Sequence, residues 1–150
     1  MIVGHSISKF FRKKKYIINN MSMTLKGPKI VYLENSDFNS DGTLKDDVFK
    51  NKKVLIFIQA NWCGHCQHAK PDYQQFADLN QDADVMCATV LTDGEPELAK
   101  KLSSGFDGNI TPVKGFPTYY MVKGGTKEYY ENNIGRDKES LKKFIQTMQL

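Results

Sequence analysis

The sequence predicts a single domain of the α/β class. A length of 150 residues fits one domain and leaves enough chain to bury a core. The run Val54–Ile58 is apolar without interruption and rich in β-branched residues, which is typical of a strand buried on both faces. Similar short apolar runs alternate with segments of helical periodicity along the chain. That alternation is typical of a sheet covered by helices.

The elements before the central strand are short. Lys29–Leu33 is expected to form the first strand, and the turn-rich segment Asn35–Gly42 to form a loop. Its acidic residues resemble a calcium loop faintly, but no glutamate stands where such a loop needs its last ligand, so a plain loop is favoured. Residues 44–49 predict a short amphipathic helix.

After the central strand, a tight turn at Asn61–Trp62 is expected to lead into a helix whose apolar pattern continues to Leu79. Pro71 lies inside this helix and predicts a kink. The later elements follow from the same patterns. A strand is expected at Val85–Leu91, and a helix at residues 96–105 that ends at Gly105. A hairpin that turns at Gly124-Gly125 is expected to join Thr118–Val122 to Lys127–Tyr130. A last helix is expected to have one apolar face, formed by Leu141, Phe144, Ile145 and Met148.

Two cysteines stand where the helix after the central strand begins. A helix N-terminus has unpaired N–H groups and about half a positive charge, and both stabilise a thiolate. A cysteine in this setting can titrate between about 3.5 and about 7.5 instead of near 8.5. Cys63, nearest the turn, is therefore the predicted nucleophile, and Cys66 is placed to resolve a mixed disulfide. His65 can donate to the Cys63 thiolate or, when protonated, pair with it.

These residues resemble a known family. The segment Trp62-Cys63-Gly64-His65-Cys66, with Pro71 five residues later, resembles the active site of thioredoxin-fold domains of the protein disulfide isomerase type. The resemblance continues at Val113–Thr118, which is similar to the family's cis-proline loop, and at Gly135-Arg136. It covers residues 29–145 and implies a thioredoxin fold: a central mixed sheet with helices on both faces, in the order βαβαβαββα.

The resemblance also implies roles for individual residues. The catalytic set would be Cys63, Cys66, His65, Gly64 and Arg136, and the substrate-binding set Trp62, Phe116 and Pro117. Arg136 would swing toward Cys66 and lower its pKa, and a cis bond before Pro117 would place an extended substrate beside Cys63. No dissociable cofactor is implied, because the electrons reside in the cysteine pair. The expected partners are protein or peptide thiols and disulfides and a redox partner, with the chain a monomer.

Two departures from the family concern the proton that Cys66 must lose. The family's buried acid lies six positions before the first cysteine, and Phe57 stands there. The lysine that usually pairs with the acid aligns near Thr89 or Leu91. Losing both partners together is physically coherent, because replacing a buried ion pair with apolar groups can be neutral or stabilising.

The remaining cysteine and histidine residues are given structural interpretations. Cys87 is expected to be a small buried hydrophobe in a strand, and His68 a solvent-facing helix residue. A zinc site at Cys63, His65, Cys66 and His68 is disfavoured, because structural sites usually draw ligands from a second segment. No metal is therefore expected.

Residues 1–27 are expected to form a basic, disordered arm in front of a thioredoxin-like domain at 28–150. The net charge of +4 is uneven, because residues 1–33 carry seven cations and no acid, which leaves −3 for residues 34–150. A targeting segment or a basic patch for anionic lipid or nucleic acid are alternatives, as is a true start at Met21 or Met23. The sequence shows neither a secretory signal nor a membrane span, and no nucleic acid is required. A cytoplasmic or non-classical location is favoured.

Three functions remain open. The first is a protein disulfide oxidoreductase or isomerase, and the second a thioredoxin-like reductant. Histidine between the cysteines favours the first, more oxidising couple. The third is a thioredoxin-fold binding module docked by its arm, which the intact cysteine pair disfavours.

Overall fold

The computed structural model describes residues 23–147, and the predicted alternation of strands and helices is present. Three short 3-10 helices, η1 to η3, accompany the main elements. In chain order the elements are β1 (Ile30–Tyr32), η1 (Asn35–Asp37), η2 (Asp47–Phe49), β2 (Lys53–Gln59), α2 (Gly64–Leu79), β3 (Val85–Leu91), η3 (Thr92–Gly94), α3 (Pro96–Ser103), α4 (Gly105–Gly108), β4 (Thr118–Lys123), β5 (Tyr129–Glu131) and α5 (Lys138–Thr147).

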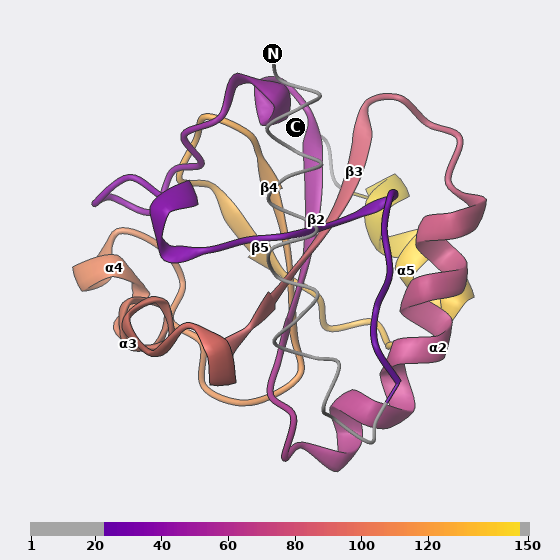
Figure 1. Cartoon of the computed structure of the whole chain (residues 1–150). Helices are drawn as coiled ribbons and strands as arrows, with labels where there is room; N and C mark the ends of the chain where they lie inside the picture. Colours follow the sequence, from indigo (N-terminus) through magenta and orange to yellow (C-terminus); the bar gives the residue numbers. More distant parts are fainter. Residues whose placement is uncertain (1–22, 148–150) are drawn as a thin grey trace.

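The strands form one mixed sheet in the order β1-β3-β2-β4-β5. β1 and β2 run parallel to β3, whereas β4 is antiparallel to β2 and β5 to β4. Helices α2 and α5 cover one face, and α3 and α4 lie on the other (Figure 1). The predicted mixed sheet with helices on both faces is confirmed.

Alternate residues of β2 enter separate cores. Leu55 and Phe57 point into the core beneath α2 and α5, and Val54, Ile56 and Ile58 into the core beneath α3. All five side chains are at most 1% exposed. Burial of each such side chain stabilises the fold by about 1.5–3 kcal/mol. β2 is thus held from both sides, and its end is a rigid support for the segment that follows.

The prediction of a helix at residues 44–49 is wrong. Leu44 forms an isolated bridge with Phe38, and only Asp47–Phe49 winds into a single 3-10 turn. The Asp46 carboxylate accepts a hydrogen bond from Val48 N–H at 3.0 Å, which caps this turn. A segment this short gains too few helical hydrogen bonds to offset nucleation, so local capping decides its shape.

Residues 23–29 form an extended strap along α2, drawn in indigo in Figure 1. Leu25 is 1% exposed and belongs to the core beneath α2. Lys26 N–H donates to Gln74 Oε1 at 2.7 Å, and Gln74 Nε2 donates to Lys26 O at 3.0 Å. Tyr32 Oη donates to Leu25 O at 2.6 Å. Residues 23–27 of the predicted arm therefore pack on the domain, while residues 1–22 lie outside the described part of the chain.

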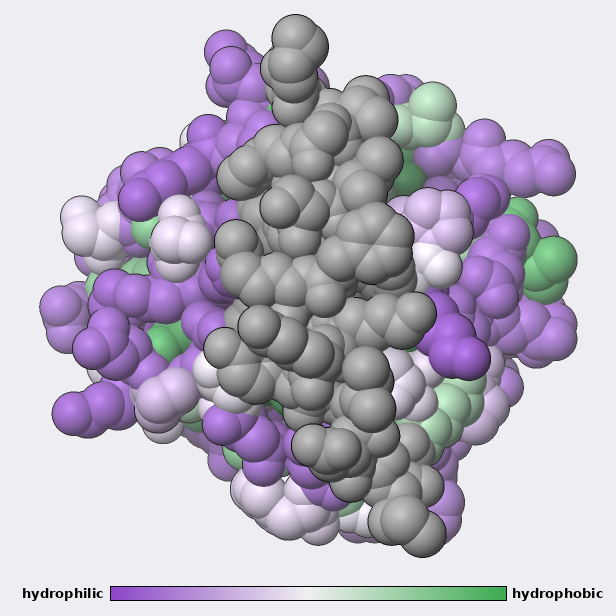
Figure 2. All heavy atoms as spheres, viewed as in Figure 1, coloured by the Kyte–Doolittle hydropathy of each residue, from purple (hydrophilic) through white to green (hydrophobic). Residues whose placement is uncertain are grey.

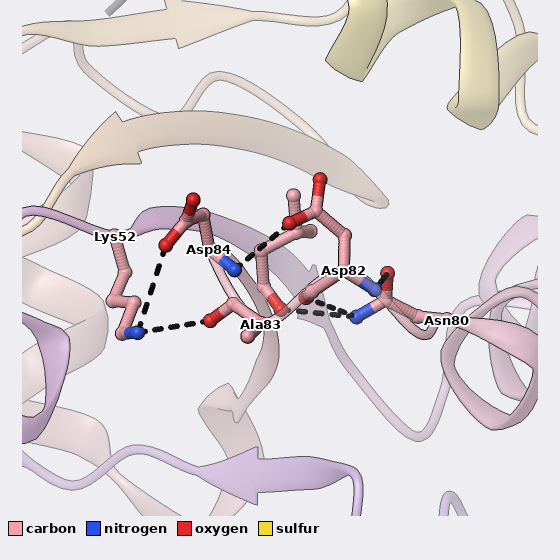
Figure 3. Close-up of polar contacts among 6 residues, drawn as sticks. Lys52, Asn80, Asp82, Ala83 and Asp84 are labelled. Carbon is pink, nitrogen blue, oxygen red and sulfur yellow. Dashed lines mark hydrogen bonds and ion pairs between the residues drawn. The ribbon is translucent and has the colours of Figure 1, made fainter.

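The turn between α2 and β3 fixes the end of α2 that lies away from the cysteines. Asn80 Nδ2 donates to Asp82 O at 3.3 Å, and Lys52 Nζ donates to Ala83 O at 2.9 Å (Figure 3). Lys52 also lies 3.9 Å from the Asp84 carboxylate. On the face shown in Figure 2, the coloured residues are mainly hydrophilic, with small scattered apolar patches. Within residues 23–147, no helix has the length and apolar character needed to cross a membrane.

Candidate active site

The two cysteines lie where the sequence places them, at the start of α2. Cys63 is the N-cap residue, and its Sγ accepts a hydrogen bond from Cys66 N–H at 3.2 Å. Cys63 is 5% exposed and Cys66 is 0% exposed, and both are free thiols. An N-cap sulfur that already receives a helix N–H is in position to carry negative charge, because it faces the positive end of the helix dipole.

The turn before Cys63 is held by hydrogen bonds from several directions. Asn61 N–H donates to Asp93 Oδ1 at 2.7 Å, and Gln67 Nε2 donates to Asn61 O at 3.0 Å. Cys63 N–H donates to Ala60 O at 3.2 Å. These bonds join the end of β2, η3 and the first turn of α2, so the position of Cys63 is set by three elements together.

The cis-proline loop lies against Cys63. The Phe116–Pro117 bond is cis, as predicted, and the Cys63 thiol donates to Phe116 O at 3.4 Å. Trp62 is 74% exposed and meets the Phe116 ring edge-on, with ring centroids 5.6 Å apart. The Phe116 carbonyl therefore lies at the Cys63 sulfur, and the exposed Trp62 ring lies against the Phe116 ring.

Cys66 is an unfavourable site for a negative charge. Burial is the main cause that raises the pKa of its thiol to about 12, and the hydrogen bond and charge of Cys63 act in the same direction. The Ala60 backbone and the charge of Lys70 oppose this rise in the pKa. Cys66 is thus protonated at neutral pH when the pair is reduced, and its loss of a proton needs assistance.

Aromatic packing fills the place of the family's buried acid. Phe57 is 0% exposed and stacks on Tyr73, with ring centroids 4.9 Å apart, and it lies 5.0 Å from the Tyr119 ring. Thr89 lies beside Phe57 in the parallel register, and its hydroxyl donates to Phe57 O at 2.6 Å. Tyr119 Oη is buried without a hydrogen-bond partner among the described residues. No carboxylate occupies the Phe57 position.

Arg136 is exposed and lines a pocket of about 250 Å³ with Pro117 and Tyr119. Burial raises the pKa of Tyr119, and the positive charge of Arg136 opposes this rise. The predicted swing of Arg136 toward Cys66 stays a prediction. Gly64 and His65 are exposed at the start of α2.

His68 is exposed, and Cys87 is 2% exposed, as expected. Burial raises the pKa of the Cys87 thiol to about 12. Within the described residues, no three side chains of His, Cys, Asp or Glu come together in a way that could hold a metal ion.

Lys70 was missed by the sequence reasoning. It lies one turn after Cys66 in α2 and is 3% exposed. Its Nζ donates to Met23 O at 2.9 Å and to Gln67 Oε1 at 3.2 Å. The sequence did contain a signal for its burial. Lys70 is four residues after Cys66 and three before Tyr73, and these spacings place all three side chains on the same, apolar side of the helix.

Comparison with known proteins agrees with this geometry. Residues 29–147 match the Thioredoxin family. The chain belongs to that family. The thioredoxin-like protein 453L of Invertebrate iridescent virus 6 is 32% identical over 126 residues, which cover 77% of this chain and 91% of that protein.

Relatives of the protein disulfide isomerase type support the predicted branch of the family. Protein disulfide isomerase-like 2-1 of Oryza sativa is 34% identical over 64% of this chain, but this chain spans only 24% of that protein's length. The first thioredoxin domain of mouse protein disulfide-isomerase A4 shares the fold, with a TM-score of 0.57 and 22% identity, over 79% of this chain and 74% of that domain. The chain is thus a thioredoxin-fold domain that is similar to domains of protein disulfide isomerases, and its general chemistry is that of a thiol oxidoreductase.

Proposed function

We propose that this protein exchanges disulfides with protein substrates through Cys63 and Cys66. The observation that carries the proposal is the position of Cys63: its sulfur caps α2, receives the Cys66 N–H and lies 3.4 Å from the Phe116 carbonyl of the cis-proline loop. A substrate chain that pairs with the backbone of this loop has its disulfide beside the sulfur. Trp62 and Phe116 supply the apolar contact surface.

The reaction proceeds in two exchanges. The Cys63 thiolate attacks one substrate sulfur, and the other sulfur leaves as a thiolate that takes up a proton. Cys66 then loses its proton and attacks Cys63, which releases the second substrate thiol and leaves a Cys63–Cys66 disulfide. Two electrons pass from the pair to the substrate, so no dissociable cofactor is needed. In the reverse direction the disulfide oxidises a substrate dithiol, and a redox partner restores the pair.

The proposal is tested by trapping each exchange. Purified protein should reduce insulin in the presence of dithiothreitol and refold a scrambled disulfide substrate. Cys63→Ser should abolish both activities, whereas Cys66→Ser should accumulate mixed disulfides at Cys63. Cys87→Ser is the matched control at a buried thiol away from the site. Undiminished activity in Cys63→Ser would refute the proposal.

A thioredoxin-like reductant is the second candidate, and the similarity to the viral thioredoxin-like protein favours it. The two candidates differ in reduction potential, about −180 mV for protein disulfide isomerase against about −270 mV for thioredoxin. We propose the more oxidising couple, because His65 and not proline stands between the cysteines. Equilibration with glutathione would separate the two, and a value near that of thioredoxin would favour the reductant.

A further inference from the structure

A buried ammonium group lies in the helix that carries the cysteines. Lys70 is 3% exposed, and no other lysine or arginine among the described residues is buried. Removing an ammonium group from water costs several kcal/mol unless its partners compensate. That desolvation lowers the pKa of Lys70. An apolar side chain could occupy the same position without this cost, so the charge requires an explanation.

Hydrogen bonds connect Lys70 to the turn that positions Cys63. Its Nζ donates to Gln67 Oε1 at 3.2 Å, and Gln67 Nε2 donates to Asn61 O at 3.0 Å. Asn61 N–H in turn donates to Asp93 Oδ1 at 2.7 Å. Lys70 Nζ also donates to Met23 O of the strap at 2.9 Å. The ammonium group therefore has a fixed position, and a fixed charge needs no rearrangement when a thiolate forms nearby.

Charged groups of the active site act on Lys70. Cys66 in α2, Asp93 in η3 and Cys63 at the N-cap of α2 each favour its ammonium form. Reciprocally, the charge of Lys70 favours the thiolate of Cys66. The interaction operates in a buried region, where solvent screens charges weakly. The site has no carboxylate at Phe57, and Arg136 lies at the surface, so Lys70 is the cation already in place.

We propose that Lys70 is a positioning residue for the cysteine pair: its fixed ammonium group stabilises the thiolates and holds the Asn61–Trp62 turn through Gln67. The inference rests on the proposed function only in taking Cys63 and Cys66 as the redox couple. Because Cys66 is protonated at neutral pH in the reduced pair, the effect on the redox equilibrium comes through the Cys63 thiolate. Stabilising that thiolate favours the dithiol form over the disulfide, so Lys70 makes the couple more oxidising.

The test replaces the charge while keeping the shape of the side chain. Oxidised glutathione and the reduced pair exchange two electrons to give the Cys63–Cys66 disulfide and two molecules of reduced glutathione. Lys70→Met should shift this equilibrium toward the protein disulfide by about tenfold, which is about 30 mV toward more negative potential. In an ultraviolet titration of Lys70→Met, the thiolate of the cysteine pair should also form at a higher pH than in the wild type. Lys70→Arg retains the charge and should restore most of both values.

A matched control separates charge from mechanical support. Gln74→Ala removes the hydrogen bonds between α2 and Lys26 of the strap but leaves Lys70 in place, so the potential should stay that of the wild type. An unchanged potential in Lys70→Met would overturn the proposal, as would an equal shift in Gln74→Ala. Because the glutathione equilibrium requires only the two cysteines, it remains measurable in a protein that fails the insulin assay.

A measurement on the unaltered protein covers the case in which Lys70→Met does not fold. Thiolates favour the charged form of Lys70, so nuclear magnetic resonance titration should give Lys70 a higher pKa in the reduced protein than in the oxidised one. Equal pKa values in the two redox states would refute the proposed interaction.

Discussion

Phe57→Glu places a carboxyl group where the family keeps its buried acid. Phe57 is 0% exposed and packs between Tyr73 and Tyr119. In such apolar surroundings desolvation raises a carboxyl pKa, and a rise of about three units is expected, from about 4.3 to about 7.3. At 1.36 kcal/mol per unit, ionisation of the buried group costs about 4 kcal/mol of folding free energy.

The sign of the pH dependence follows from this raised pKa. Between about pH 4.3 and about pH 7.3 the folded variant holds a proton that the unfolded chain has lost, so the free energy of unfolding falls as pH rises. The loss of folding free energy is absent below about pH 4.3 and complete above about pH 7.3. Urea unfolding across the window should show the fall, and Phe57→Leu, which also loses aromatic packing but gains no charge, should not. A pH-independent Phe57→Glu would refute the desolvation argument.

The same variant tests how Cys66 loses its proton. In the wild type, resolution of a mixed disulfide at Cys63 should accelerate with pH between about pH 6 and about pH 9, since burial raises the pKa of the Cys66 thiol. A carboxylate with a pKa near neutrality is a competent base, so Phe57→Glu should resolve faster near neutral pH. Stopped-flow kinetics of the wild type and of Phe57→Glu across this pH range test both expectations. Coincident pH profiles would mean that proton transfer does not limit the reaction.

Three further variants test the packing around the site. Leu25→Ala should lower the free energy of unfolding by about 2–5 kcal/mol, whereas Leu79→Ala, the same change at a side chain that is 63% exposed, should cost far less; equal losses in urea unfolding would contradict the packing of the strap. Tyr119→Phe should be neutral or stabilising by about 1 kcal/mol, because it removes a buried hydroxyl that lacks a partner; a clear loss of stability would contradict this. Cys87→Ala should flatten the decline in stability above about pH 9 by about 1.4 kcal/mol per pH unit, because the folded thiol, with its pKa raised to about 12, stays protonated while the unfolded one ionises; identical slopes would exclude that raised pKa.

The parts of the site predicted from sequence are those that local patterns determine. The apolar run of β2 and the cysteine spacing after it place Cys63 at the N-cap, and the Gly-Phe-Pro-Thr segment marks the cis bond at Pro117. Both features depend on residues adjacent in the chain. Helix and strand positions that bury a clear apolar pattern were predicted for the same reason.

The features that the sequence did not reveal depend on distant contacts. Leu25 is a single apolar residue in a polar segment, and its burial follows from a hydrogen bond to Tyr32 and from the pairing of Lys26 with Gln74. Residues 44–49 lack the length for a helix, so capping by Asp46 prevailed over periodicity. Lys70 is a polar residue on an apolar helix face, and only the assembled strap shows that it is covered.

Phe57 and Lys70 together suggest a different solution to deprotonation from that of the family. A buried acid would accept the proton of Cys66 during the reaction, whereas a buried cation lowers the free energy of the thiolate that results. The first changes the rate of proton transfer to an internal group. The second shifts the pH at which the thiolate forms, and leaves water as the acceptor. On the proposed role of Lys70, removing its charge in Lys70→Met should therefore slow resolution, whereas Lys70→Arg, which keeps the charge, should resolve at nearly the rate of the wild type. An equal fall in rate in Lys70→Met and Lys70→Arg would instead identify Lys70 with the geometry of the turn and not with the charge of the thiolate.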